Sequence, residues 1–275
     1  MLSCSTVSGH PLVREVDVVR VGDGSAERLV DRVAVEAPLE VRLDGRPFSV
    51  IMRTPGDDAH LAAGFLFSEG ILRQPSDIRS TRVGDGVVDV ALGSGLAADI
   101  DRILGGRRQV AMNSSCGVCG RRSIDDLELP AGPLPHEWTV DAAVVVGLPE
   151  RLRAHQPAFA ETGGLHAAAL ATPAGEIEVS AEDVGRHNAV DKLLGRMWLE
   201  ERLPLSGSIL VVSGRLSFEI VQKAWLAGVP MVVAVSAPSS LAIELAGRAA
   251  MTLVGFTRRG RFNVYAGAAR IRSAA

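Results

Sequence analysis

The chain has 275 residues, of which 47% are hydrophobic, so it is long enough to bury a sizeable core in one large domain or in a domain with a smaller partner. A formal net charge of −3 argues against a general nucleic-acid-binding protein, and three cysteines exclude a disulfide-stapled scaffold. The N-terminus lacks the basic-then-apolar order of a signal peptide, and glycine and proline break the longest uncharged run, Ala224 to Ile243, so we expect a cytoplasmic protein with no membrane partner.

Strand signals dominate the first half of the chain. Residues 14–21 alternate between apolar and polar, and the pairs Asp44-Gly45 and Asp85-Gly86 indicate tight hairpin turns. Between the two turns, Asp57 is a suitable N-cap for a helix that runs to Ser68 and stops near Gly70. The strands expected around the turns are Val41–Leu43, Phe48–Met52 and Val87–Leu92.

The second half alternates between strand and helix signals. A stretch rich in proline and glycine, Leu129–Pro135, separates the halves and suggests a strand-rich part at residues 1–135 and an α/β part at residues 136–275. A helix kinked or split by Pro149 is expected first, and buried apolar strands that alternate with helices then predict a layered α/β core. The expected elements are helices at Thr139–His155, Asp183–Leu199, Ser217–Ala227 and Ser239–Gly247, strands at Leu165–Ala171, Ile177–Val179, Ser208–Ser213 and Met231–Val235, and a final hairpin of Thr252–Phe256 and Phe262–Tyr265.

The sharpest local signal is the pair Cys116 and Cys119, each followed by glycine. Arg121 and Arg122 lie beside it and favour thiolate over thiol, and a thiolate can either attack a sulfur donor or bind a metal. Spacing alone leaves metal binding, sulfur or redox chemistry, and inert packing all open. A closed zinc site needs four ligands, so histidines would have to complete it.

A second signal is a pair of polar loops, each expected between a buried strand and the next helix. Ser213-Gly214-Arg215 follows one strand, and residues 236–240, which include Ser236 and Ser239, follow the next. This edge of an α/β sheet is where ligands bind, and free N–H groups at helix N-termini suit phosphates. Ordinary turn and capping chemistry is the alternative explanation for the serines, but a cap needs no guanidinium.

Three further polar clusters stand out. Residues 182–188 contain Arg186 and His187 behind Asp183, which is the expected N-cap of the following helix. His166 follows a flexible Thr-Gly-Gly turn, although a single histidine is more often structural than a ligand. The basic turn Thr257–Arg261 lies in a C-terminal stretch with six arginines and no acidic residue, and it is either a solvated hairpin tip or a phosphate-binding turn.

Taken together and in this order, the motifs resemble the formate dehydrogenase accessory sulfurtransferases, the FdhD family. The similarity covers roughly residues 14–270, with serine at positions 239 and 240 where the family often has threonine. The segments that carry the resemblance are residues 53–58, 61–66, 69–71, 116–120, 162–167, 182–192, 213–215, 236–242, 255–256 and 263–265.

The resemblance implies a sulfur carrier that takes persulfide sulfur from a cysteine desulfurase on Cys116, with Cys119 assisting. The implied acceptor is the bis-molybdopterin guanine dinucleotide form of the molybdenum or tungsten cofactor, which is destined for the formate dehydrogenase catalytic subunit. GDP is then an expected analogue of the ligand. The fold is expected to resemble the cytidine deaminase α/β core, and the protein is expected to form a homodimer and to bind neither zinc nor nucleic acid.

The cofactor-binding stretch of the family maps onto Phe256, Thr257, Arg258, Arg259, Gly260 and Arg261. We extend the expected ligand contacts to Arg186, His187, Arg215, Ser236, Ser239 and His166. Two rival interpretations remain: a zinc protein that uses Cys116, Cys119 and a histidine, and a non-catalytic cofactor chaperone. The zinc deaminases place His-x-Glu before their cysteine pair, whereas His166-Ala-Ala follows the pair here and lacks the glutamate.

Overall fold

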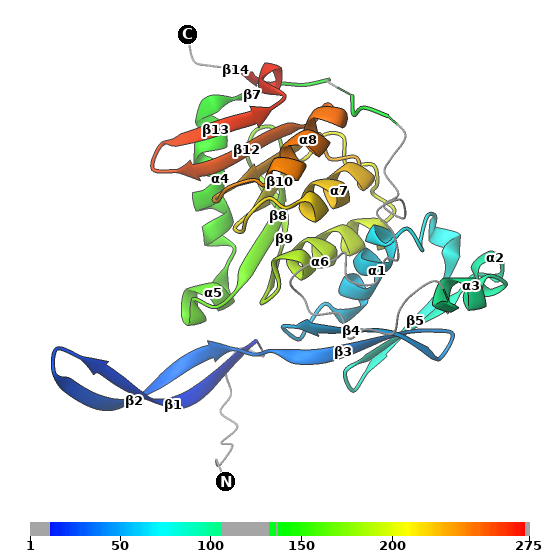
Figure 1. The fold of residues 1–275 in the computed structure, drawn as a ribbon, viewed down its shortest axis with the longest axis horizontal. Coiled ribbons are helices and arrows are strands. Elements are labelled where there is room, and N and C mark those ends of the chain that lie inside the picture. The colour runs from blue at the N-terminus through cyan, green and yellow to red at the C-terminus, as the bar shows by residue number, and fades with distance from the viewer. Residues whose placement is uncertain (1–11, 106–131, 136, 273–275) are drawn as a thin grey trace.

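The structure, a computed structural model, describes residues 12–105, 132–135 and 137–272. Its mixed α/β architecture with a strand-rich N-terminal part confirms the expected fold class (Figure 1). No helix in these ranges is long and apolar enough to cross a membrane. The division into parts at residue 135 remains a prediction.

The N-terminal part contains two separate β units, an antiparallel hairpin and a mixed sheet in which the central pair, β3 and β6, is parallel. Strands β1 (Val13–Gly22) and β2 (Ser25–Ala34) form a long hairpin that projects beyond the rest of the molecule (Figure 1). A four-stranded sheet follows, in the order β4-β3-β6-β5. Its strands and the short helices around it are β3 (Ala37–Leu43), β4 (Arg46–Arg53), a 3₁₀ turn (Pro75–Asp77), β5 (Ile78–Gly84), β6 (Val87–Leu92), α2 (Ser94–Ala97) and α3 (Ile100–Gly105).

Both predicted Asp-Gly turns are confirmed. Asp44 and Gly45 have φ of 47° and 75°, and Asp85 and Gly86 have φ of 48° and 73°. Two consecutive left-handed residues are what a two-residue hairpin turn requires, and this explains why the chain places Asp-Gly there. Each turn joins neighbouring antiparallel strands, β3 to β4 and β5 to β6.

The C-terminal part is built on a six-stranded mixed sheet in the order β13-β12-β11-β10-β8-β9. The central neighbours β10, β11 and β12 are parallel, and the outer pairings are antiparallel. The strands are β8 (His166–Ala171), β9 (Ile177–Asp183), β10 (Ile209–Val212), β11 (Met231–Ala234), β12 (Thr252–Arg258) and β13 (Arg261–Ala266), while β7 (Val140–Asp141) and β14 (Ile271–Arg272) form a separate short pair behind a 3₁₀ turn at Ala268–Arg270.

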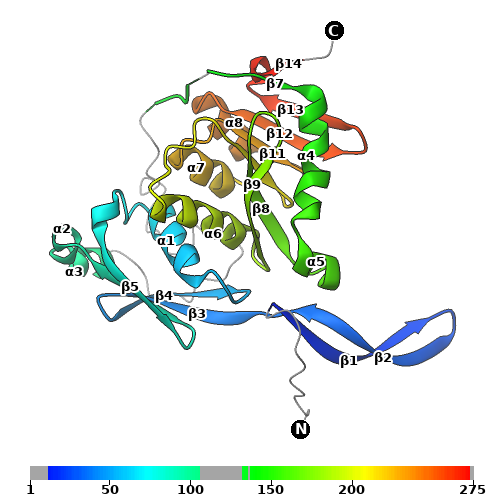
Figure 2. The same cartoon turned by 180° about the vertical axis from the view of Figure 1, so that it is seen from behind.

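Helices cover both faces of this sheet (Figure 2). Helices α6 (Arg186–Leu199), α7 (Phe218–Leu226) and α8 (Ser240–Arg248) pack on one face, and α4 (Ala142–Ala154) packs on the other. Alternate residues of each central strand face opposite layers, as the twofold periodicity of a strand requires. In β10, Leu210 and Val212 face α6 and α7, whereas Ile209 and Val211 face α4.

Helix α1 (Asp58–Ser68) joins the two parts by crossing α6 at very close range (Figure 1). Gly64 and Gly195 make the crossing possible. A Cβ atom on Gly64 would run into the backbone carbonyl of Asp191, and one on Gly195 would run into the carbonyl of His60. Side chains at these positions would therefore force the two helices apart.

Three helix predictions need correction. Asp57 occupies the predicted N-cap position of α1, which ends at Ser68 as expected, but it has φ of 55° and its side chain makes no cap hydrogen bond; the carboxylate lies 3.3 Å from Nδ1 of His60. Asp183 is not an N-cap either, because β9 extends through it and α6 begins only at Arg186. The segment predicted as a helix from residue 139 begins as β7, and Pro149 lies inside the unbroken helix α4.

Candidate functional site

The two predicted polar loops lie side by side at the carboxyl edge of the parallel strands. The backbone N–H of Leu216 donates to the carbonyl of Ala237 at 3.0 Å, and the N–H of Ser239 donates to the carbonyl of Leu216 at 2.9 Å. Ser217 and Ser239 cap α7 and α8, since their hydroxyls accept from the backbone N–H of the third residue beyond; for Ser239 this is the capping role that the sequence left open as the alternative to ligand binding. The loops therefore bring two capped helix N-termini to one edge of the sheet.

Gly214 lies beside Arg186 and His166 at this edge. A Cβ atom there would lie 3.4 Å from the Arg186 side chain and 3.5 Å from Nδ1 of His166. The Ser213 hydroxyl accepts from the backbone N–H of Ala167 at 2.9 Å and lies 3.4 Å from Nδ1 of His166. The structure thus gathers three of the predicted ligand residues, Arg186, His166 and Arg215, around one loop.

The environment of His166 lowers the pKa of its imidazole below the ordinary value of 6.5. Burial is the main cause, and the positive charges of Arg186 and then Arg215 add to it, while Asp183 opposes them. His166 is therefore neutral near pH 7. An anion bound beside His166 and these arginines would raise that pKa again.

A cavity of about 670 Å³ opens beside this edge and reaches α4 and α5 (Pro157–Thr162). Its volume lies within the range of small-molecule sites. Four of the predicted site residues contribute to its wall, together with Ser213. The lining residues are Pro149, Glu150, Leu152, Arg153, Gln156, Phe159, Gly163, Gly164, Leu165, His166, Ser213, Val235, Thr257, Arg258 and Arg259.

The basic turn between β12 and β13 supplies one side of the cavity. Arg259 and Gly260 form the turn with φ of 51° and 75°. Phe256 also has a positive φ, 53°, at an irregular point of the strand pairing, and its N–H donates to the carbonyl of Ser236 at 3.1 Å. The Arg258 guanidinium lies 5.3 Å from the centre of the Phe256 ring. The backbone is thus bent where exposed arginines meet the cavity.

Sequence reasoning missed the contribution of α5. Glu182, at the end of β9, accepts from the backbone N–H groups of Ala158 at 3.0 Å and Phe159 at 2.8 Å, and so fixes the start of this short helix. The Arg153 guanidinium stacks 4.0 Å from the Phe159 ring centre. The segment carries no glycine-rich or charged motif, so only its pairing with Glu182, 23 residues away, could have revealed it.

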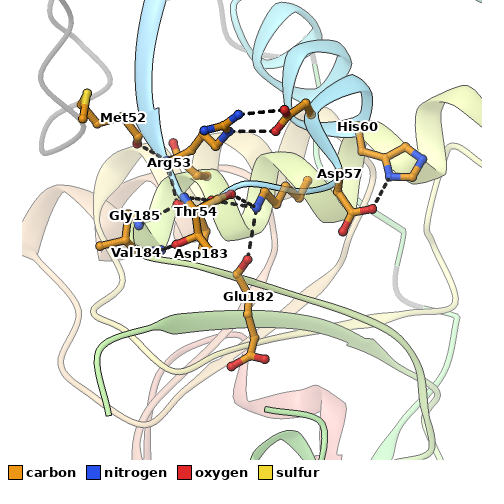
Figure 3. A network of polar contacts seen from close by, with 12 residues as sticks. Met52, Arg53, Thr54, Asp57, His60, Glu182, Asp183, Val184 and Gly185 are labelled. Carbon is orange, nitrogen blue, oxygen red and sulfur yellow. Dashed lines mark hydrogen bonds and ion pairs between the residues drawn. The ribbon is translucent and has the colours of Figure 1, made fainter. Parts of the chain in front are cut away.

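Most of the polar motif at residues 182–192 has a structural role (Figure 3). The buried carboxylate of Asp183 accepts from the N–H of Thr54 at 3.1 Å and from the N–H of Gly185 at 2.8 Å. It also accepts from Nδ2 of Asn188 at 2.9 Å and pairs with Nζ of Lys192 at 2.8 Å. Lys192 further donates to the carbonyl of Thr54 at 2.8 Å. These contacts attach the end of β4 to the α/β core.

A second buried ion network runs from α1 to the N-terminus of α7. Asp191 accepts from the Ser68 hydroxyl at 2.8 Å and pairs with Nζ of Lys223 at 2.7 Å. Burial by itself would lower the pKa of Lys223, but the carboxylates of Asp191 and Glu219 raise it, so the lysine is charged. Glu219 lies 3.4 Å from Nε2 of His187. That imidazole lies 3.2 Å from the Ser217 hydroxyl, which places His187 behind the helix cap rather than in the cavity wall.

Cys116 and Cys119 lie outside the described residues, as do Arg121 and Arg122. Within the described ranges, no three His, Cys, Asp or Glu side chains are placed together as metal ligands would be. Several predicted residues belong to the loops and the turn beside the cavity but are not part of its lining. They are Ser236, Ser239, Phe256, Gly260 and Arg261.

Comparison with known proteins gives one consistent result. Residues 34–272 match the FdhD/NarQ family. The "Sulfur carrier protein FdhD" of Streptomyces avermitilis is 48% identical over 272 residues, covering 92% of this chain and 94% of the relative, and its counterpart in Sulfurisphaera tokodaii is 45% identical over 92% and 96%. A Desulfotalea psychrophila protein, crystallised as a candidate formate dehydrogenase accessory protein, matches with a TM-score of 0.76 and 29% identity over 95% of this chain and 100% of its own.

Proposed function

Because this chain belongs to the FdhD/NarQ family, we propose that it is a sulfur carrier that serves a formate dehydrogenase. In this role it accepts sulfur from a cysteine desulfurase on Cys116 and passes it to a guanine-dinucleotide molybdenum or tungsten cofactor. The observation that carries the proposal is the arginine-rich cavity at the sheet edge in a chain that also has a Cys116-Gly-Val-Cys119 motif. The arginine-rich cavity suits an anionic nucleotide, and the cysteine motif suits the transfer of sulfur.

The acceptance step balances without an external oxidant. The Cys116 thiolate attacks the outer sulfur of a persulfide on the desulfurase, a sulfur–sulfur bond forms at Cys116, and the desulfurase cysteine leaves as a thiolate. The neighbouring Arg121 and Arg122 favour the thiolate that begins this step. Cys119 then assists release by attacking the inner sulfur, which forms a Cys116–Cys119 disulfide, frees hydrosulfide and leaves a disulfide for a dithiol to reduce.

The described residues fit the nucleotide part of such a substrate. Arg258 and Arg259 offer guanidinium groups for phosphates, and Thr257 has a fully buried hydroxyl with no hydrogen-bond partner in the described part of the chain. His166 and Ser213 extend the polar wall toward Arg215. A ligand with two nucleotide arms suits a homodimer that offers one such cavity per subunit.

Mass spectrometry tests the carrier assignment directly. After incubation with a cysteine desulfurase and cysteine, Cys116 should gain about 32 Da, the mass of one sulfur atom. Cys119→Ala should still accept sulfur, whereas Cys116→Ala should not. If Cys116→Ala still accepts sulfur and activates formate dehydrogenase, the carrier is another residue; if it activates the enzyme without accepting sulfur, the protein is a cofactor chaperone.

A further inference from the structure

We infer that the cavity beside α5 receives the base of the nucleotide, that Gln156 and Thr257 bind the edge of this base, and that the Arg153–Phe159 pair covers its face. The inference rests on the proposed function, because it assigns parts of that ligand to parts of the same site. It places the base away from Phe256, which belongs to the cofactor-binding stretch expected from the sequence.

Thr257 gives the first reason. Its side chain is fully buried in the cavity wall, and Oγ1 has no hydrogen-bond partner among the described residues. An unpaired buried hydroxyl destabilises a protein, and valine would fill the same volume without that penalty. A polar group that enters the cavity would give the hydroxyl a partner.

Gln156 gives the second reason. It lies between α4 and α5, is 5% exposed and lines the cavity. Its backbone is held in place, because its N–H donates to the carbonyl of Arg153 at 3.2 Å and its carbonyl accepts from the N–H of Ala160 at 2.9 Å. A primary amide presents a donor and an acceptor side by side, which matches the paired donor and acceptor on the edge of a purine base.

Phe159 gives the third reason, because it contributes a phenyl ring to the lining. The Arg153 guanidinium lies 4.0 Å from the ring centre, and Glu182 fixes the backbone of Phe159. Flat guanidinium and aromatic groups are the surfaces on which bases stack. Phe256, by contrast, is not part of the lining, and Arg258 already lies over its ring.

The orientation of the ligand follows from exposure. Arg258 and Arg259 belong to the same lining but are exposed to solvent, whereas Gln156 and Thr257 are buried. Phosphates remain partly hydrated and pair with guanidinium groups, while a base gains by leaving water. The base therefore points inward and the phosphates point toward the turn of β12 and β13.

Calorimetric titration with GDP, ADP and inorganic pyrophosphate tests this orientation. Thr257→Val and Gln156→Leu should each weaken GDP by roughly tenfold, the loss expected for one or two hydrogen bonds, and should narrow the preference for GDP over ADP. Pyrophosphate affinity should not change. Arg258→Ala should weaken GDP and pyrophosphate alike.

Thr252→Val is the matched control. Thr252 lies in the same strand and is buried, but its hydroxyl donates to the carbonyl of Gly267 at 2.8 Å. Its removal should lower the melting temperature and leave GDP affinity per folded molecule unchanged. Thr257→Val should weaken GDP and should not lower the melting temperature, because its hydroxyl has no partner among the described residues.

Three results would overturn the inference. Unchanged GDP affinity in Thr257→Val and Gln156→Leu would show that the base does not bind in the cavity, and it would not affect the proposed function. An equal loss of GDP and pyrophosphate affinity in Thr257→Val and Gln156→Leu would place the phosphates, and not the base, at the buried end of the cavity. No GDP binding by the unmodified protein, together with sulfur acceptance on Cys116, would remove the nucleotide site altogether.

Discussion

The junction of the N-terminal part with the α/β core, where the end of β4 and helix α1 meet α6, and the cavity at the sheet edge both contain short polar motifs, but the polar groups have different partners. At the junction, the Asp183 carboxylate accepts three hydrogen bonds and pairs with Lys192. In the cavity wall, the Thr257 hydroxyl has no partner in the described part of the chain. Both regions contain several polar residues close together in the sequence. Only the partners distinguish a structural network from a surface prepared for a ligand.

The largest expected effect is on the stability of the junction. Lys192→Met would leave the Asp183 carboxylate buried without its cation, and we expect a loss of about 3–5 kcal/mol in the free energy of unfolding. Urea denaturation measures this loss. GDP affinity per folded molecule should stay unchanged.

Arg196→Met is the control for this prediction. Arg196 lies in the same helix and pairs with Glu200 at 2.8 Å, but both side chains are largely exposed. Its loss should change the unfolding free energy little. A similarly small effect of Lys192→Met would show that the junction does not depend on its buried pair.

The next effect is on binding at the cavity. Arg258→Ala and Arg215→Ala should each weaken GDP by about 1.5–3 kcal/mol, the scale of a lost hydrogen bond to a charged group. Neither change should alter the urea midpoint, since both side chains are exposed. Unchanged GDP affinity in the two variants would argue that the ligand binds away from this edge.

A smaller effect is expected from the helix crossing. Gly64→Ala should destabilise the protein by about 1–3 kcal/mol, because the added methyl group meets the Asp191 carbonyl across the junction. Gly147→Ala in α4 is the comparison, since a Cβ there only approaches the end of the Arg151 side chain at 3.7 Å. That change should stabilise the helix slightly. Thermal unfolding of the two variants measures the difference in their stability.

The smallest effect concerns pH. Burial and then Arg186 hold the pKa of His166 below 6.5 in the free protein, and a bound anion should raise it. Binding then takes up a proton, so GDP affinity should increase as pH falls through the interval between the two pKa values. His166→Gln should lose this part of the pH dependence and keep that of the ligand phosphates. If GDP affinity depends on pH in the same way in His166→Gln and in the unmodified protein, the phosphates bind away from His166.

Local signals were predictable from the sequence, and long-range partners were not. The Asp-Gly turns and the alternating α/β pattern depend on a few neighbouring residues, and the structure confirms them. The cap at Ser239 is equally local, and it was recognised as the alternative to a ligand contact. Asp183 was misassigned as a cap because one of its partners, Thr54, lies 129 residues away. Gln156 was missed because the residues that form its cavity come from separate segments of the chain.

The chain has only two lysines, Lys192 and Lys223, against 27 arginines, and each lysine side chain is only 3% exposed. A protease that cleaves after lysine therefore has no accessible site while the fold is intact. Both sites lie in helices of the ion networks, so cleavage requires those helices to open. The rate of digestion should accordingly report opening of the core, without any label and at concentrations too low for calorimetry.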